Sequence, residues 1–295
     1  MELLDGKNLS QVLKDEIKSE VSTLTDAGNR PPHLVAILVG EDGASQTYVN
    51  HKIRSCEYVG YKSTMDRFSA DITQEELLAR VEEHNQDDSV DGMIVQLPLP
   101  KHIDPNAVIY AIKPEKDVDG FHPFNVGKMT LGLPTLLPAT PAGIMEMFKR
   151  YNISTSGKRT AVLGRSNIVG RPMSVLMSGK GDPGNSTVTI CHSRTPKDEL
   201  KAICLESDII IVALGIPGFL TGDMVREGAV VIDVGITRVE DETAKRGFRL
   251  KGDVEFASVS SKCSYITPVP GGVGPMTVGM LLKNTLQAYK KRLSV

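Results

Sequence analysis

The clearest indication of the fold class is the segment Thr160-Ala161-Val162-Leu163-Gly164-Arg165-Ser166-Asn167-Ile168-Val169-Gly170-Arg171-Pro172. Residues 160–163 predict a short buried strand, a turn containing Gly164 and Gly170 follows it, and Pro172 opens a helical pattern. The backbone N–H groups of such a turn, together with the helix dipole, can hold a pyrophosphate. Because Ser166 replaces the second glycine of the G-x-G-x-x-G pattern, the turn alone leaves open both cofactor binding and a purely structural role.

The same alternation of strand and helix continues on both sides of this stretch. Apolar runs predict strands at residues 33–39, 92–96, 160–163, 187–191, 209–213 and 230–234. Amphipathic patterns predict helices at residues 8–24, 45–59, 74–83, 141–151, 172–177 and 197–206. This order indicates an α/β protein with parallel sheets and helices on both faces.

A proline-rich stretch at residues 131–141 indicates a domain boundary near Thr140. We expect one α/β domain from residues 1–139 together with a C-terminal helix at 276–295. Residues 140–275 are expected to form a second, Rossmann-like domain with a parallel sheet. The Gly/Pro-rich loop 268–275 ends this second domain; it is stiff and ligand-sized, and could return the chain to the first domain.

Composition excludes several classes of partner and site. The chain has 295 residues and a formal net charge of −2, with scattered Lys and Arg, so we expect neither nucleic acid nor an anionic membrane as partner. It has no run of about eighteen apolar residues that could span a membrane. The four cysteines form no C-x-x-C pair, which argues against zinc and disulfides and favours a reducing compartment, most simply the cytoplasm.

The strand end after residue 191 bears on the choice of cofactor. NAD-binding folds place Asp or Glu at this point, where it accepts hydrogen bonds from the ribose hydroxyl. Here the chain reads His192-Ser193-Arg194-Thr195, without a carboxylate, and hydroxyl and guanidinium groups suit a 2′-phosphate. With Arg165 this pattern favours NADP, although a solvated basic loop is the alternative. The strand ends at 215–217 and 235–236 would complete the rim of that site.

Tyr48 and Lys52 stand four residues apart in a predicted helix, so both project from one face. A phenol beside an ammonium can handle protons, because each group tunes the pKa of the other. The Y-x-x-x-K pattern also occurs in short-chain dehydrogenases, but there it follows the nucleotide-binding turn and here it precedes it. A surface lysine beside a half-buried tyrosine is the alternative for an isolated pair.

Two further motifs bear on chemistry. Gln96 ends a predicted buried strand, where ligands collect in open α/β sheets. The segment 116–120 places Asp117 and Asp119 before a glycine, but no third acid or histidine follows at a suitable spacing. We therefore expect a turn there rather than a metal site, and predict no metal for this chain.

Five segments, at 45–52, 95–100, 114–125, 164–172 and 268–278, resemble the bifunctional methylenetetrahydrofolate dehydrogenase/methenyltetrahydrofolate cyclohydrolase family. The resemblance runs in order from about Leu4 to the C-terminus, and the run Pro-Gly-Gly-Val-Gly-Pro-Met-Thr is its most specific part. It implies two α/β domains around a cleft that holds folate, and usually a homodimer.

The resemblance also implies roles for individual residues. Lys52 would be the main acid/base group, Gln96 would position and tune it, Tyr48 would flank the folate ring, and Asp119 would bond the pterin edge. The implied folate-binding residues are Tyr48, Lys52, Val95, Gln96, Leu97, Asp119, Pro268, Val269, Pro270, Gly271, Gly272, Val273, Gly274, Pro275 and Met276. The implied NADP contacts are Gly164, Arg165, Ser166, Ser193 and Ile236.

The implied activity is NADP-dependent oxidation of 5,10-methylenetetrahydrofolate to the methenyl form, followed by hydrolysis to 10-formyltetrahydrofolate. A lysine whose pKa is lowered by a neighbouring cation and by partial burial could move the protons of the second step. The segment 178–185 is longer than the family's usual loop and is expected near the adenosine end of the cofactor. It could alter cofactor affinity or only decorate the surface, and we expect decoration.

Three alternatives compete with this function. A monofunctional enzyme of the same fold is disfavoured because Lys52 and Gln96 are both present. A non-catalytic NADP-binding or regulatory module would have lost the Tyr48, Lys52, Gln96 and Asp119 set. An NADP-dependent reductase of another small substrate is disfavoured by the loop 268–275.

Overall fold

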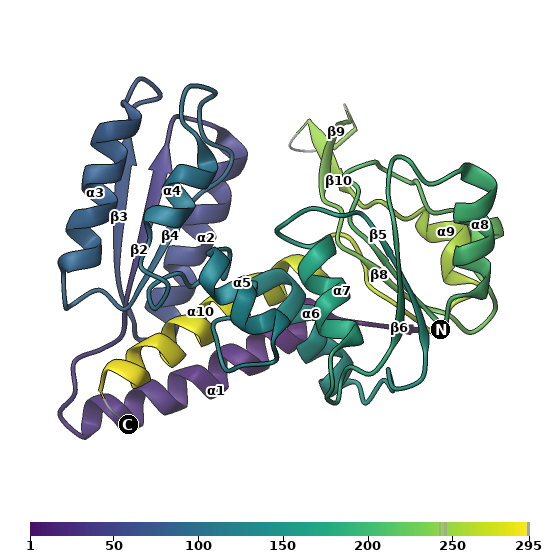
Figure 1. The fold of residues 1–295 in the computed structure, drawn as a ribbon, viewed down its shortest axis with the longest axis horizontal. Helices are drawn as coiled ribbons and strands as arrows, with labels where there is room; N and C mark the ends of the chain where they lie inside the picture. Colours follow the sequence, from purple (N-terminus) through teal and green to yellow (C-terminus); the bar gives the residue numbers. More distant parts are fainter. Residues whose placement is uncertain (242, 245–246, 294–295) are drawn as a thin grey trace. The chain divides into compact units, whose positions relative to one another are not determined.

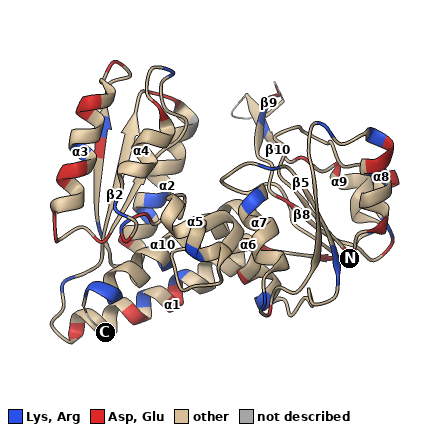
Figure 2. Cartoon of the chain, in the orientation of Figure 1, with Lys and Arg blue, Asp and Glu red and all other residues tan. Residues whose placement is uncertain are grey.

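The computed structural model describes residues 1–241, 243–244 and 247–293, and these form two compact units (Figure 1). Unit 1 comprises Met1–Ser10 and Thr140–Thr277, and unit 2 comprises Gln11–Ala139 and Val278–Val295. None of the helices in the described ranges is long and apolar enough to cross a membrane. Lys and Arg are interspersed with Asp and Glu on helices such as α3 (Gln74–Gln86) and α8 (Lys197–Glu206), as Figure 2 shows.

Unit 2 is built on a three-stranded parallel sheet in the order β3 (Lys62–Phe68), β2 (His33–Val39), β4 (Gly92–Val95). Every residue of the central strand β2 is buried. Its side chains at 35, 37 and 39 pack in one core with residues of α3 and α4 (Pro105–Ala111). The apolar run at 33–39 therefore predicts its strand correctly, because both faces of a central parallel strand are covered.

The remaining helices of unit 2 include α2 (Gly43–Val59) and α5 (Pro123–Thr130). Asp42 caps α2 by accepting a hydrogen bond from the Ser45 backbone. Sequence reasoning missed β3, because its residues KSTMDRF are polar and mostly only half buried. As an edge strand, β3 pairs with β2 on one side only, so its side chains need not be apolar.

Unit 1 contains a six-stranded sheet in the order β1 (Glu2–Leu3), β11 (Tyr265–Ile266), β8 (Val230–Asp233), β7 (Ile209–Val212), β5 (Arg159–Leu163), β6 (Thr187–Cys191). All its pairings are parallel. The predicted Rossmann-like sheet is thus present, and the four strands predicted for it, β5, β6, β7 and β8, begin and end within one residue of the predicted bounds, whereas β1 and β11 were not predicted. An antiparallel hairpin, β9 (Thr237–Glu240) with β10 (Phe248–Lys251), follows β8.

The placement of the first residues differs from the expectation that residues 1–139 form one domain. Residues 1–10 belong to unit 1, where β1 extends the sheet. The Glu2 backbone donates to Ser264 and the Leu4 backbone to Ile266, and the Leu4 side chain is fully buried. Nothing in the local sequence marks a two-residue strand, so only its long-range partners reveal it.

Short helices complete unit 1: α6 (Ala139–Arg150), α7 (Gly170–Ser178), α8, η1 (Gly222–Met224) and α9 (Phe256–Ser260). Two long helices, α1 (Gly6–Asp26) and α10 (Val273–Arg292), have residues in both units. The prediction that the last helix starts at Met276 is wrong by three residues. Pro275 lies in the first turn of α10, where the missing N–H of a proline leaves no helix bond unmade, and its carbonyl accepts from Ser10 Oγ at 2.8 Å.

Candidate active site and nucleotide site

Helix α2 carries Tyr48 and Lys52 on one face, as their spacing predicts. The Lys52 Nζ lies 4.7 Å from the centroid of the Tyr48 ring. Lys52 is only 4 % exposed, although its side chain ends in an ionisable amine. An ammonium over an aromatic face is stabilised electrostatically, and more strongly when water is excluded. The interpretation of an isolated surface lysine is therefore wrong.

Gln96 meets Lys52 from the end of β4. The Lys52 Nζ donates a hydrogen bond to Gln96 Oε1 at 3.3 Å. The amide of Gln96 is oriented by a second bond, from Nε2 to the carbonyl of Leu97 at 2.7 Å. Its neighbour Val95 is buried, and Leu97 is half buried. A residue on α2 and a residue after β4 thus form one polar contact across 44 positions of sequence.

The pKa of Lys52 is lowered, and the main cause is burial. The expected neighbouring cation is not the cause, because the groups that act electrostatically on Lys52 are Asp119 and, more weakly, Cys56, and both raise its pKa and so oppose burial. Burial also raises the pKa of Asp119, while Lys52 lowers it. Tyr48 has a raised pKa for the same reason, burial, with a further contribution from Asp119. The structure thus brings Tyr48, Lys52, Gln96 and Asp119 into one electrostatic group in unit 2.

The segment 116–120 forms a turn, as expected. Asp117 is buried and accepts from the backbone of Gly120 and His122 and from Asn125 Nδ2. Burial raises the pKa of Asp117 despite these bonds. Gly120 has a positive φ of 77°, and a Cβ there would meet the backbone of Leu137 at 2.5 Å. This turn sets the position from which Asp119 acts on Lys52.

In unit 1, the turn after β5 approaches its neighbours closely. Gly164 has a φ of 124°, and a Cβ on it would lie 2.3 Å from the carbonyl oxygen of Ala213. A Cβ on Gly170 would lie 2.2 Å from the carbonyl oxygen of Gly164. The Ser166 hydroxyl accepts from the backbone of Val169 and Gly170 at the start of α7. Ser166 therefore shapes this turn through its hydroxyl, in a place where the usual pattern has a glycine.

The proposed 2′-phosphate residues follow two adjacent strand ends. Leu163 of β5 pairs with Cys191 of β6, so Arg165 and Ser193 emerge at the same edge of the sheet. Both residues are exposed. The turn that contains Ser193 is ordered by His192, whose backbone donates to Thr195 Oγ1 and whose Nδ1 accepts from the Arg194 backbone. Ile236, which follows β8, is 53 % exposed although its side chain is apolar.

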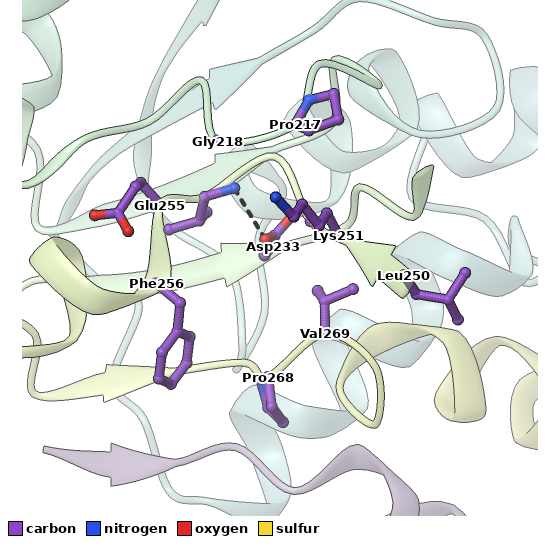
Figure 3. Close-up of a pocket in the computed structure, with 11 residues that line it drawn as sticks. Pro217, Gly218, Asp233, Leu250, Lys251, Glu255, Phe256, Pro268 and Val269 are labelled. Atoms are coloured by element: carbon purple, nitrogen blue, oxygen red, sulfur yellow. Dashed lines mark hydrogen bonds between the residues drawn. The ribbon is translucent and has the colours of Figure 1, made fainter. Parts of the chain in front are cut away.

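The loop before α10 contributes to a cavity in unit 1 of about 420 Å³. Pro268 and Val269 line it together with Asp233, Pro217 and Phe256 (Figure 3). The later residues behave differently: Met276 is fully buried, and Gly272 and Val273 are buried as well. This cavity includes only the first two residues of the implied folate-binding segment.

The segment 178–185 is held to the body of unit 1 by the hydroxyl group of Thr155. Thr155 Oγ1 donates to the Gly184 carbonyl and accepts from the Gly184 N–H. Most residues of the segment are exposed. This arrangement agrees with the expectation of surface decoration.

Sequence reasoning missed three buried groups near these sites. The sequence pattern indicates only a turn at Lys116 and marks no role for Asp233 and Asp253. All three are buried in spite of their charge. Asp233 could have been noticed, because it ends a predicted apolar strand at the ligand-binding edge of the sheet.

Two family models match this chain. Residues 4–119 match the catalytic domain described as "Tetrahydrofolate dehydrogenase/cyclohydrolase". Residues 138–293 match the NAD(P)-binding domain of the same name.

Relatives and solved structures agree with these matches. The "Bifunctional protein FolD" of Phocaeicola vulgatus is 60% identical over 99% of both chains. The crystal structure of the bifunctional dehydrogenase/cyclohydrolase FolD from Campylobacter jejuni is 48% identical, with a TM-score of 0.92 over 99% of both chains. The Trypanosoma brucei enzyme, solved with NADP cofactor and inhibitor, is 39% identical, with a TM-score of 0.95 over 100% of this chain and 99% of that one.

Proposed function

Because this chain belongs to the tetrahydrofolate dehydrogenase/cyclohydrolase family, we propose that it catalyses two successive reactions of folate-bound one-carbon units. The first oxidises 5,10-methylenetetrahydrofolate to 5,10-methenyltetrahydrofolate with NADP. The second hydrolyses the methenyl form to 10-formyltetrahydrofolate. The observation that carries the proposal is the buried Lys52, held by Gln96 Oε1 and the Tyr48 ring.

The residues of unit 1 fit a dinucleotide. The close approaches at Gly164 and Gly170 bring backbone N–H groups and the start of α7 to one place, which suits a pyrophosphate. Arg165 and Ser193 at adjacent strand ends suit a 2′-phosphate, and the exposed Ile236 offers an apolar contact. When bound, NADP supplies the acceptor for the hydride that leaves the methylene carbon.

Lys52 is the acid/base group of the second reaction. Water adds to the methenyl carbon, one C–N bond breaks, and protons move between the water oxygen and the departing nitrogen. Because burial lowers the pKa of Lys52, a larger fraction of its amine is neutral at neutral pH than in an exposed lysine, and the neutral amine can accept a proton and return it as the ring opens. Without burial, lysine would be almost fully protonated there.

The neighbours of Lys52 orient it. Gln96 Oε1 accepts from Nζ and so fixes the direction of the amine, while Gln96 itself is held through Leu97. The Tyr48 ring supports the ammonium form and offers a face for a planar pterin. Asp119 limits how far burial lowers the pKa of Lys52, and its carboxylate can accept from the pterin edge.

Further residues of the substrate site are proposed by resemblance. Val95 and Leu97 flank Gln96, and the segment from Pro268 to Met276 supplies the remaining folate contacts. We also propose that the protein acts as a homodimer in the cytoplasm. Size-exclusion chromatography with light scattering tests the first of these, and cell fractionation tests the second.

A two-part spectroscopic assay tests the function. Protein mixed with methylenetetrahydrofolate and NADP should form NADPH, and absorbance of the methenyl product should rise and then decay. If no NADPH forms, the dehydrogenase assignment is wrong. If NADPH forms but added methenyltetrahydrofolate decays no faster than in buffer, the chain is a monofunctional dehydrogenase of the same fold.

A further inference from the structure

Two carboxylates are buried at the carboxyl edge of the unit 1 sheet. Asp233 ends β8 and is 4 % exposed, and Asp253 follows β10 and is fully buried. Burial, with Asp253 nearby, raises the pKa of Asp233 to about 6. Asp233 is therefore predominantly ionised at neutral pH. Neither residue belongs to the catalytic group or to the proposed NADP contacts.

Asp233 binds three backbone N–H groups. Its Oδ1 accepts from Gly235 at 3.0 Å and from Asp253 at 2.9 Å. Its Oδ2 accepts from Val254 at 3.0 Å, which is the dashed line in Figure 3. The carboxylate thus joins the turn after β8 to the segment that follows β10.

Asp253 extends this connection to the next strand. Its Oδ2 accepts from the backbone of Leu214 at 2.7 Å and of Gly215 at 2.9 Å, directly after β7. Its Oδ1 is buried and accepts no hydrogen bond from any described residue. That oxygen lies against Gly235, where a Cβ would come within 2.3 Å of it.

The two carboxylates therefore connect the loops that follow β7 and β8. The second loop leads directly to Ile236, a proposed NADP contact, and the first lies beside Ala213, against which Gly164 packs. Burying two carboxylates costs free energy that burying an apolar pair would not cost. This cost calls for a role of their hydrogen bonds beyond packing. Among the described residues, both carboxylates accept hydrogen bonds from backbone N–H groups alone. A carboxylate can accept such bonds without a donor of its own.

We propose that Asp233 and Asp253 are positioning residues for dinucleotide binding, which hold the loops after β7 and β8 at the spacing that the cofactor requires. This inference rests on the proposed function. It assigns the pair to the dehydrogenase half, because the cyclohydrolase reaction needs no cofactor.

The pattern of bonds predicts a graded series of variants. Asp233 uses both oxygens, so Asp233→Asn places an amide N–H against a backbone N–H and breaks the connection. Asp253 uses one oxygen, so Asp253→Asn keeps the bonds to Leu214 and Gly215, and its amide occupies the place of the unpartnered Oδ1. Asp253→Ala removes both bonds.

Asp208 offers a matched control at the opposite edge of the same sheet. Its carboxylate also binds a backbone N–H, that of Arg159 at 2.9 Å, together with the Arg226 side chain at 2.7 Å. Asp208→Ala should lower the melting temperature without changing the response to NADP.

The experiment measures KM for NADP, NADP affinity by calorimetry, hydrolysis of added methenyltetrahydrofolate without NADP, and the melting temperature. Asp233→Asn and Asp253→Ala should raise KM and Kd for NADP about tenfold or more, since each loses buried hydrogen bonds. Their cyclohydrolase activity should stay within about twofold, and Asp253→Asn should bind NADP like the parent protein.

Two outcomes would overturn the inference. One is unchanged NADP affinity in Asp253→Ala. The other is an equal loss of both activities in Asp253→Ala and Asp208→Ala, which would make the role purely structural. Absence of NADP-dependent turnover in the parent protein would instead contradict the proposed function, so the two failures are distinguishable.

Discussion

Unit 2 contains two buried lysines whose surroundings differ sharply. Lys116 is 3 % exposed, and its Nζ donates to three backbone carbonyls, those of His84, Asn85 and Asp87, at 2.7–2.9 Å. Lys52 is 4 % exposed, and among the described residues its Nζ donates only to Gln96, at 3.3 Å. Burial lowers the pKa of both amines. The difference therefore lies in hydrogen bonding and not in exposure.

This comparison separates a structural lysine from a reactive one. The three carbonyls at Lys116 belong to the last turn of α3 and the residue after it, where helix carbonyls lack partners, so the lysine completes a helix end. Its donors are all used, which leaves no direction in which to move a proton. Lys52 has donor capacity left beside an aromatic ring and an acid, which is the arrangement expected of a proton-transfer group.

The largest effect is expected for Lys52→Met. Hydrolysis of added methenyltetrahydrofolate should fall by about 10²- to 10⁴-fold, the usual contribution of a positioned acid/base group. Retained turnover would remove Lys52 from this role. Stopped-flow or steady-state absorbance provides the measurement.

The same variant should be as stable as the parent protein or more stable. The folded-state pKa of Lys52 lies below its unfolded value, so the charged amine destabilises the fold at low and neutral pH. As the pH rises toward the usual lysine pKa of about 10.4, this penalty disappears, and with it the gain from methionine. Melting temperatures across that pH range check the sign, and a gain that grows with pH would contradict it.

Lys116→Met should show the opposite pattern. It leaves three carbonyls without their donor, and we expect a loss of about 2–3 kcal/mol in the free energy of unfolding. Turnover per folded molecule should stay within about twofold, since Lys116 contacts no proposed catalytic group. Urea unfolding and active-site-normalised rates measure the two effects. A loss of activity without a loss of stability would make the two lysines alike.

Gln96→Glu should give the Lys52 ammonium a carboxylate as its ion-pair partner. A carboxylate at the Gln96 position raises the pKa of Lys52, so hydrolysis should fall about tenfold at neutral pH and recover at alkaline pH. Gln96→Ala serves as the control, because it lowers the rate without an alkaline recovery. A Glu variant with an unshifted pH profile would show that Gln96 does not act on the pKa of Lys52.

The smallest effects are expected at Tyr48. Tyr48→Phe keeps the ring under Lys52 and should change hydrolysis less than about threefold, whereas Tyr48→Leu removes an interaction worth about 1 kcal/mol and should lower it roughly fivefold. The difference between the two variants isolates the ring from the hydroxyl. Equal hydrolysis rates in the two variants would show that the cation–π contact does not contribute to the reaction.

Local patterns predicted most of the elements that build both units. The apolar runs of β2, β5, β7 and β8 are strong signals, because a parallel strand buried on both faces is largely apolar. The edge strand β6 is mostly exposed, and its β-branched residues favour a strand instead. The strands that escaped prediction were short or polar. Both β1 and β3 form because a neighbouring strand offers hydrogen bonds, which their own residues do not indicate.

In the candidate site, too, local geometry was predictable and long-range contacts were not. The spacing of Tyr48 and Lys52 was enough to place them on one helix face, since the period of a helix is local geometry. Their contact with Gln96, and the action of Asp119, depend on β4 and on the turn at Gly120.

Local sequence patterns were enough to predict the class of fold, the glycine turn after β5 and the family to which the chain belongs. Tertiary structure alone decided that Lys52 is buried with few partners while Lys116 is buried with all of its donors used. It also brought Asp233 and Asp253 together at one sheet edge. The physical reason is that periodicity and turn chemistry are properties of neighbouring residues. Desolvation and hydrogen-bond satisfaction instead depend on which distant segments the fold brings together.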